Sequence, residues 1–215
     1  MERSFIGRWA PLLGILAPLL WFAGVAVGES GDTPAEEAGA EEILTYFQDE
    51  TNSILLGSLL FMLGTLAFIL FITVLRDRWR AAGASDSAIT LGYVTGLVGS
   101  AFLAATWGPQ LGVAIAIEDM NASLSPATAE AAWHAGTGFF VLGEMVLALF
   151  LFATAALMMR AGVLPSWLGW LAILLGVVAL VPPIGWAAII FGLPVWLILT
   201  SIFLLVAGRA TPTTP

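Results

Sequence analysis

The sequence predicts an all-α fold, a polytopic transmembrane helical bundle with six spans, and composition, run length and charge placement support it. Hydrophobic residues make up 60% of the 215 residues and charged residues only 10%. A soluble domain has about 45–50% apolar and about 25% charged residues. Several apolar runs approach or exceed the roughly 20 residues that cross a bilayer core. All of the positive charges are arginines that lie outside these runs.

Six apolar segments fit helices that satisfy their own backbone hydrogen bonds, as a bilayer requires. The predicted spans are 9–28, 54–75, 89–112, 135–158, 167–181 and 186–207. The third run continues to Ile117, so either that helix tilts or residues 111–117 form an outer interfacial segment. Pro182, Pro183 and Gly185 predict a tight turn between the last two spans. We expect residues 1–215 to form a single transmembrane domain.

The arginines predict the orientation of the chain in the cell membrane. With six spans all seven of them fall on one side, and that side is expected to be cytoplasmic, with both termini. With five spans, Arg209 would lie outside. The first apolar run also resembles a secretory signal, but about 20 residues is long for one, so we expect a retained helix.

Acidic residues gather in two outer loops, which we interpret as a solvated surface. No short array of alternating acids with a glycine turn suggests a metal site among them. The acids of the two loops are Glu29, Asp32, Glu36, Glu37, Glu41, Glu42, Asp49, Glu50, Glu118, Asp119 and Glu130.

The first outer loop carries the signature of a short amphipathic helix. Thr33 is a candidate N-cap, Pro34 fits the first helical position and Glu36 would close a capping box. The apolar residues on one side of this helix are Ile43, Leu44 and Phe47. We expect the helix to cover the bundle, and docking of a partner is the alternative. Ser125-Pro126 similarly predicts a helix start that runs into the fourth span.

The composition excludes several kinds of chemistry. The chain has no cysteine, which removes disulfides and thiolate sites, and no lysine, which removes the phosphate-binding loop that needs one. One histidine cannot form a paired-imidazole metal or haem site. The sequence therefore predicts no metal, no cofactor and no nucleic-acid partner. The lipid bilayer is the expected partner, and a second copy or another membrane protein stays open.

Glu144 is the acid that lies deepest in an apolar run. It precedes Met158, at the inner end of its helix, by fourteen residues, which places it about 21 Å into a core of about 30 Å. A charge there is costly, so such carboxyls face protein or water and often mark a pathway. Burial favours the neutral acid. Glu144 is thus either a packed neutral acid or a ligand- or proton-binding group.

His134 is the single histidine and precedes Glu144 by ten residues. This spacing separates the two by about 15 Å along a helix and about 80° around it. The side chains cannot touch within one helix, so we expect His134 to lie at the outer boundary. A water-bridged relay between them stays open.

Depth counted from the cytoplasmic ends gives candidate partners for Glu144. Near or slightly outside its level lie Ser58, Thr106, Gln110 and Pro194. Pro109 and Pro194 should kink the third and sixth helices. An acid beside kinked helices fits a small binding site, and it also fits ordinary packing.

The segment "RAGVLPSWLGWLAILLGVVALV", Arg160 to Val181, carries a resemblance, as do the loop "LRDRWRAA" and the acidic outer helix. The chain resembles small bacterial membrane proteins, common in actinobacteria, that have about six helices and are grouped as domains of unknown function. The resemblance implies the fold and topology, and it implies no activity and no catalytic residues.

Three functions are consistent with these features. The first is a non-catalytic membrane protein, either a small-ligand or lipid binder or an accessory subunit. The second is a proton-coupled small-solute transporter that uses Glu144. The third is an intramembrane enzyme, which ranks last because the chain offers one buried carboxyl and one peripheral histidine.

Overall fold

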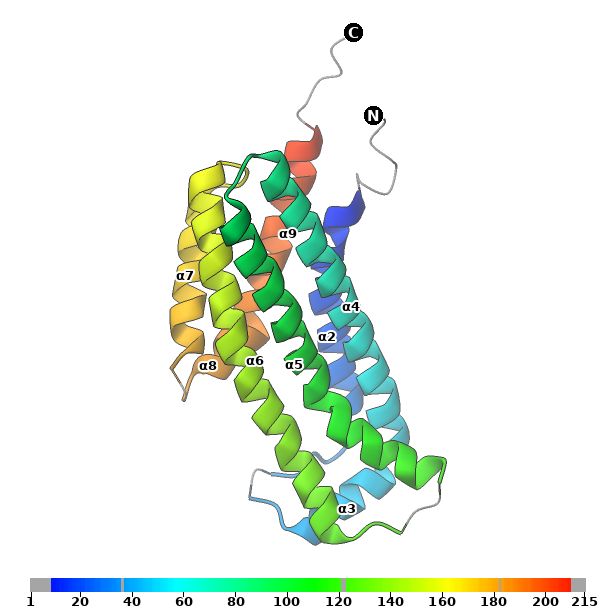
Figure 1. Cartoon of the computed structure of the whole chain (residues 1–215). Coiled ribbons are helices and arrows are strands. Elements are labelled where there is room, and N and C mark those ends of the chain that lie inside the picture. Colours follow the sequence, from blue (N-terminus) through cyan, green and yellow to red (C-terminus); the bar gives the residue numbers. More distant parts are fainter. Residues whose placement is uncertain (1–8, 36, 121–122, 182, 210–215) are drawn as a thin grey trace. The chain divides into compact units, whose positions relative to one another are not determined.

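The computed structural model describes residues 9–35, 37–120, 123–181 and 183–209, and every regular element in these ranges is a helix (Figure 1). In chain order the elements are η1 (Ala10–Leu12), α2 (Leu13–Gly28), α3 (Ala40–Asp49), α4 (Thr51–Ala81), α5 (Asp86–Glu118), α6 (Pro126–Ala161), α7 (Ser166–Ala179), α8 (Gly185–Ala187), η2 (Ala188–Gly192) and α9 (Leu193–Arg209). The all-α prediction is therefore confirmed.

Five helical segments are long and apolar enough to cross a membrane, which indicates a multi-pass membrane protein. They are Ala10–Gly28, Thr51–Ala81, Asp86–Glu118, Pro126–Ala161 and Gly185–Ala207. The helix α7 is also apolar but has only 14 residues. The predicted first, second, third, fourth and sixth spans all lie within or overlap these helices.

The chain forms two compact units. Unit 1 comprises Met1–Pro18, Leu66–Ser100 and Gly143–Pro215, and unit 2 comprises Leu19–Thr65 and Ala101–Leu142. The helices α2, α4, α5 and α6 contribute to both units, whereas α3 belongs to unit 2 and α7 to α9 belong to unit 1. The expectation of a single transmembrane domain stays a prediction.

The third apolar run is one continuous helix. The helix α5 extends from Asp86 to Glu118 with Pro109 inside it, which is about 50 Å of helix. Residues 111–117 therefore continue the helix, and whether they lie outside the bilayer stays a prediction. Within unit 2, Val113 and Ala114 of this part are buried against α3.

The amphipathic helix of the first outer loop exists, but the predicted start is wrong. The helix α3 begins at Ala40, and its N-cap Gly39 makes no side-chain capping bond. The Thr33 hydroxyl instead donates to the Glu29 carbonyl at 3.4 Å, just beyond the end of α2. Pro34 precedes the helix, and Glu36 lies outside the described residues.

The apolar side of α3 covers the core of unit 2, as predicted. Ile43 and Phe47 are buried and Leu44 is partly buried. The buried residues of this cluster are Ile43, Tyr46, Phe47, Ile54, Val113, Ala114 and Ala129. The Tyr46 hydroxyl donates to the Gly28 carbonyl at 2.9 Å, which ties α3 to the end of α2.

The predicted start of the fourth span is confirmed. The helix α6 begins at Pro126, and the Ser125 hydroxyl oxygen accepts a hydrogen bond from the Thr128 backbone N–H at 3.2 Å. The Thr128 N–H also donates to the Ser125 carbonyl at 3.0 Å, so Ser125 caps the first turn with both its hydroxyl and its carbonyl oxygen.

Aromatic side chains fill the core of unit 1. Phe150 of α6 makes edge-to-face contacts with Phe68 of α4 and Trp196 of α9. The Trp196 indole Nε1 donates to the Leu168 carbonyl of α7 at 3.1 Å. This buried bond fixes α9 along α7.

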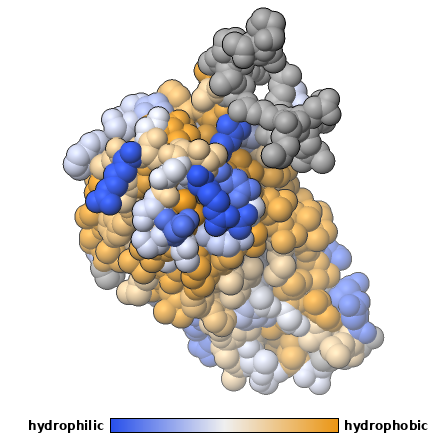
Figure 2. Space-filling view, turned by 45° about the horizontal axis from the view of Figure 1, so that its top comes forward, coloured by the Kyte–Doolittle hydropathy of each residue, from blue (hydrophilic) through white to orange (hydrophobic). Residues whose placement is uncertain are grey.

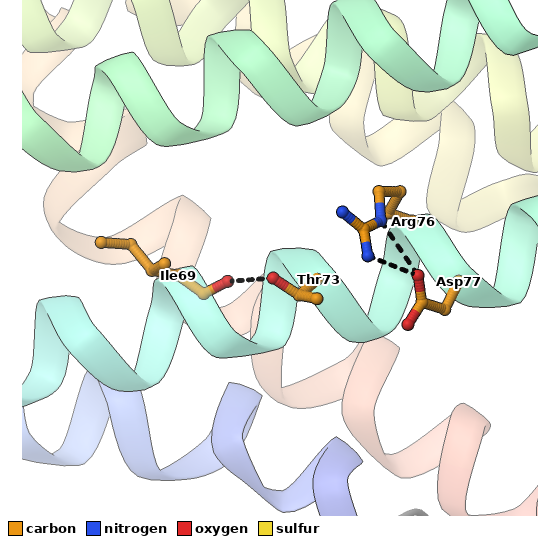
Figure 3. A network of polar contacts seen from close by, with 4 residues as sticks. All are labelled: Ile69, Thr73, Arg76 and Asp77. Atoms are coloured by element: carbon orange, nitrogen blue, oxygen red, sulfur yellow. Dashed lines mark hydrogen bonds and ion pairs between the residues drawn. The ribbon is translucent and has the colours of Figure 1, made fainter.

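The arginine-rich end of α4 also belongs to unit 1. The Arg76 guanidinium pairs with Asp77 at 2.9 Å (Figure 3) and lies over the Tyr93 ring of α5, 4.7 Å from its centroid. Thr73, one turn earlier, donates to the Ile69 carbonyl. Figure 2 shows hydrophilic side chains gathered beside hydrophobic ones at the end of unit 1 that carries the α4–α5 turn.

Candidate functional site

Glu144 lies buried at the middle of α6. Its side chain retains 6% of its accessible surface, although glutamate is rarely this buried without a partner. The carboxyl oxygen Oε1 is fully buried and has no hydrogen-bond partner among the described residues. The carboxyl of Glu144 is thus buried within the protein, and its depth in the bilayer stays a prediction.

The α7–α8 turn lies directly against this carboxyl. The position that a Cβ atom on Gly185 would occupy is 3.2 Å from Glu144 Oε2 and 2.7 Å from the Ala179 carbonyl oxygen. The Gly185 N–H donates to the Val181 carbonyl at 2.8 Å, which closes the turn. Only a residue without a side chain fits between Glu144 and the end of α7.

An irregular helical segment follows the turn. Residues Ala188–Gly192 form the π-helical segment η2, in which the Leu193 N–H donates to the Ala188 carbonyl. Pro194 comes next and cannot donate to Ile190, so the predicted disturbance of this helix is present. The Leu175 side chain of α7 lies directly over Gly192. Single π turns inside α-helices often occur at functional sites.

Glu144 has no counter-ion among the described residues. The ion pair in this part of the chain joins Arg76 and Asp77. No group of three or more metal-binding side chains occurs among the residues that the structure describes. The carboxyl can therefore exchange hydrogen bonds with a small partner or bind and release a proton.

The other predicted site residues belong to unit 2. There the Thr106 hydroxyl donates to the Phe102 carbonyl at 3.1 Å. A Cβ on Gly136 would lie 2.6 Å from the Thr106 carbonyl and 3.5 Å from Gln110 Nε2. The structure thus brings Thr106 and Gln110 together where α6 approaches α5.

Ser58 and His134 differ in burial. The Ser58 side chain is fully buried, and its hydroxyl has no partner among the described residues. His134 is exposed on the first half of α6, and its place at the outer membrane boundary stays a prediction.

Sequence reasoning missed two residues of unit 1. Gly185 was predicted only as a turn residue, although it is the neighbour of Glu144. Thr200 is fully buried with an unpartnered hydroxyl. The sequence could have pointed to Thr200. No hydroxyl, amide or charged side chain occurs between Trp167 and Leu199, and Thr200 is the first polar residue after that stretch.

The fold and site together define a multi-pass helical membrane protein in which the buried Oε1 atom of Glu144 has no partner among the described residues. Comparisons of the chain with protein-family models, curated proteins and solved structures gave no significant match. The resemblance to six-helix bacterial membrane proteins stays a prediction, so function is argued from the site.

Proposed function

We propose that this chain is a non-catalytic membrane protein that binds a small molecule or lipid at Glu144. The observation that carries the proposal is the buried Oε1 atom of Glu144, which has no described hydrogen-bond partner. A buried polar atom left without a partner is destabilising by about 1–3 kcal/mol. A ligand that supplies the missing hydrogen bond would offset this loss of stability.

The neighbouring backbone supports a ligand site over plain packing. A packed neutral acid would donate to a neighbouring helix, as intramembrane polar groups commonly do. Gly185, which lies against the Glu144 carboxyl, offers no side chain to pair with it. The π-helical segment η2 begins three residues after Gly185, so the backbone beside the carboxyl is also irregular.

The topology is part of the proposal. We propose six membrane helices, namely the five long ones and α7, with both termini cytoplasmic in a bacterial cell membrane. Arginines support this orientation, because Arg78, Arg80 and Arg160 lie in the last turns of α4 and α6. Acidic residues support it too, because Glu41 and Glu42 lie in the first turn of α3 in unit 2.

Native mass spectrometry of the protein purified in mild detergent tests the binding function. We expect one non-protein mass bound with one-to-one stoichiometry to the wild type and lost from Glu144→Met, which keeps the volume and removes the carboxyl. Ala153→Ser, on the same helix and in unit 1, is a matched control that should retain the mass. Equal retention by Glu144→Met would disprove the proposed site.

A proton-coupled small-solute transporter is the second candidate, and an observation favours it. Glu144 is an isolated carboxyl without a described counter-ion, which suits a group that gains and loses a proton. This candidate requires a pH-dependent solute flux in proteoliposomes that Glu144→Gln abolishes. A flux that is unchanged in Glu144→Gln would remove Glu144 from transport.

A further inference from the structure

The α7–α8 turn differs in composition from the loops that face water. Between Trp167 and Leu199 no residue carries a hydroxyl, amide or charged side chain. The turn nevertheless exposes large apolar side chains, with Leu180 and Ile184 at 49% and Trp186 at 47%. The acidic segments after α2 and α5 show how this chain builds a solvated loop. An exposed turn without hydroxyl, amide or charged side chains is suited to an apolar medium.

The length of α7 also indicates that the turn lies in an apolar medium. The 14 residues of α7 extend about 21 Å, whereas the hydrocarbon core is about 30 Å thick. The helix begins six residues after Arg160, an exposed arginine at the end of α6. A helix that starts at this boundary ends about two thirds of the way across the core.

Contacts between α7 and the α8–α9 segment show that the two pack side by side as far as the turn. The Trp196 indole donates to the Leu168 carbonyl at 3.1 Å, and further on Leu175 packs over Gly192. At the far end Gly185 lies against the Ala179 carbonyl and the Glu144 carboxyl. The turn is therefore at the depth of Glu144.

The backbone of the turn is suited to this depth, where each unpaired donor is costly. The N–H groups of Ile184 and Gly185 both donate to the Val181 carbonyl, at 3.0 and 2.8 Å. The Val181 N–H donates to the Val178 carbonyl at 2.9 Å, and Pro183 has no N–H. These described donors need no water.

We infer that α7 and the α8–α9 segment form a re-entrant hairpin whose turn ends inside the hydrocarbon core, so that Glu144 is reached from the bilayer. Both arms enter and leave on one side. The two arms are then membrane-embedded helices that do not cross, although Gly185–Ala207 is long enough to cross, and the orientation of the termini is unchanged. Resting on the proposed function, the inference also names the ligand class. The ligand is a lipid-soluble molecule with a single hydrogen-bonding group, such as a hydroxyl or a carbonyl, and not a water-soluble ion.

Two carbodiimides of opposite solubility test the access route in wild-type protein in liposomes, with reagent on both faces. A protonated carboxyl adds across one C=N bond, and the O-acylisourea formed rearranges to a stable N-acylurea that peptide mass spectrometry locates. We expect hydrophobic dicyclohexylcarbodiimide to modify Glu144 and the water-soluble ethyl-dimethylaminopropyl reagent to leave it unmodified. The exposed carboxyls of Glu41 and Glu42 report that the water-soluble reagent is active.

The other outcomes overturn the inference. Modification of Glu144 by the water-soluble reagent shows that water reaches the site, and modification by neither reagent shows that the bilayer does not. Glu144→Gln must lose the adduct, since it lacks the carboxyl.

The absence of cysteine in the chain allows a direct depth measurement. A nitroxide on Ile184→Cys should collide with oxygen far more often than with a water-soluble nickel chelate, as should one on the apolar, exposed Met145→Cys. A nitroxide on Asp119→Cys should show the opposite preference. A water-like result at residue 184 would refute the re-entrant hairpin. If the nitroxide at residue 184 prefers oxygen but native mass spectrometry shows no retained ligand, only the proposed function is refuted.

Discussion

Glu144 of α6 and Gly185 of α8 are in direct contact, with the carboxyl oxygen Oε2 3.2 Å from the place where a Cβ on Gly185 would be. The same place is 2.7 Å from the Ala179 carbonyl oxygen, which belongs to the backbone and cannot move independently. This contact joins the middle of α6 to the turn that ends α7. Changes at either residue should therefore affect the site and the turn together.

Gly185→Ala should lower the stability of the protein and weaken ligand retention. The added methyl overlaps the Ala179 carbonyl and displaces Glu144, and overpacking of this kind is destabilising by about 1–3 kcal/mol. Thermal unfolding in detergent measures the first effect and native mass spectrometry the second. Gly138→Ala, on the helix α6 that also carries Glu144, is the control, since nothing lies within 4 Å of its Cβ position. Wild-type behaviour of Gly185→Ala would refute the close contact.

Glu144→Met should leave the unfolding temperature unchanged or raise it. The substitution removes a buried, unpaired carboxyl oxygen and keeps an apolar side chain of similar length, which often stabilises when function had kept the polar group. Glu144→Gln should fold nearly as well as the wild type, because an amide and a neutral acid form similar hydrogen bonds. A large loss of thermal stability in both variants would show that the acid has a structural hydrogen-bond partner.

Gly57→Ala should destabilise unit 2. Its Cβ would lie 2.5 Å from the Gly28 Cα and 2.6 Å from the Gly24 carbonyl oxygen, so backbone meets backbone where α2 and α4 cross. We expect a loss of about 1–3 kcal/mol, seen as a lower unfolding temperature. Gly112→Ala, inside α5 with open space at its Cβ position, should be neutral or gain up to about 1 kcal/mol from helix propensity. Equal effects of the two substitutions would contradict the close crossing.

Tyr46→Phe should weaken the attachment of α3 and change the alkaline stability. The lost hydrogen bond to the Gly28 carbonyl contributes about 0.5–1.5 kcal/mol. Burial raises the pKa of the Tyr46 phenol, and the carboxylates of Glu29 and Glu50 add to this against a lowering hydrogen bond with Thr33.

The sign of the pH effect follows from that raised pKa. The stability that the neutral Tyr46 phenol provides is complete below the unfolded-state pKa of about 10 and is lost as pH rises through the folded-state value. Thermal unfolding between pH 8 and pH 11 should therefore show a steeper alkaline decline for the wild type than for Tyr46→Phe. Parallel declines would show that Tyr46 does not contribute to it.

The sequence predicted the features that local patterns encode. Hydropathy runs located the membrane helices, and the Ser125-Pro126 pair located the start of α6. The start of α3 was wrong because the Thr33 hydroxyl bonds back to Glu29 at the end of α2 and does not cap a helix. The hydrogen-bond partner of Thr33 depends on where α2 ends in space, and capping rules based on local sequence do not predict that.

The burial of Glu144 was predictable from the sequence, and the residues that lie against it were not. Residue counting placed Glu144 within the apolar core, and helix geometry separated it from His134. The contact with Gly185 depends on how far α7 extends before it turns. The form of η2 depends on how the backbone near Pro194 redistributes its hydrogen bonds. Both are tertiary outcomes without a local sequence signature.

The central claim is that the buried Oε1 of Glu144 binds a lipid-soluble ligand. An experimental structure of the wild-type protein crystallised from a lipidic mesophase, at a resolution that shows small molecules, tests it most directly. We predict non-protein density within hydrogen-bond distance of Glu144 Oε1, next to Gly185 and continuous with the bilayer. A side chain or backbone donor of the protein on that oxygen, with no ligand density, would contradict the claim.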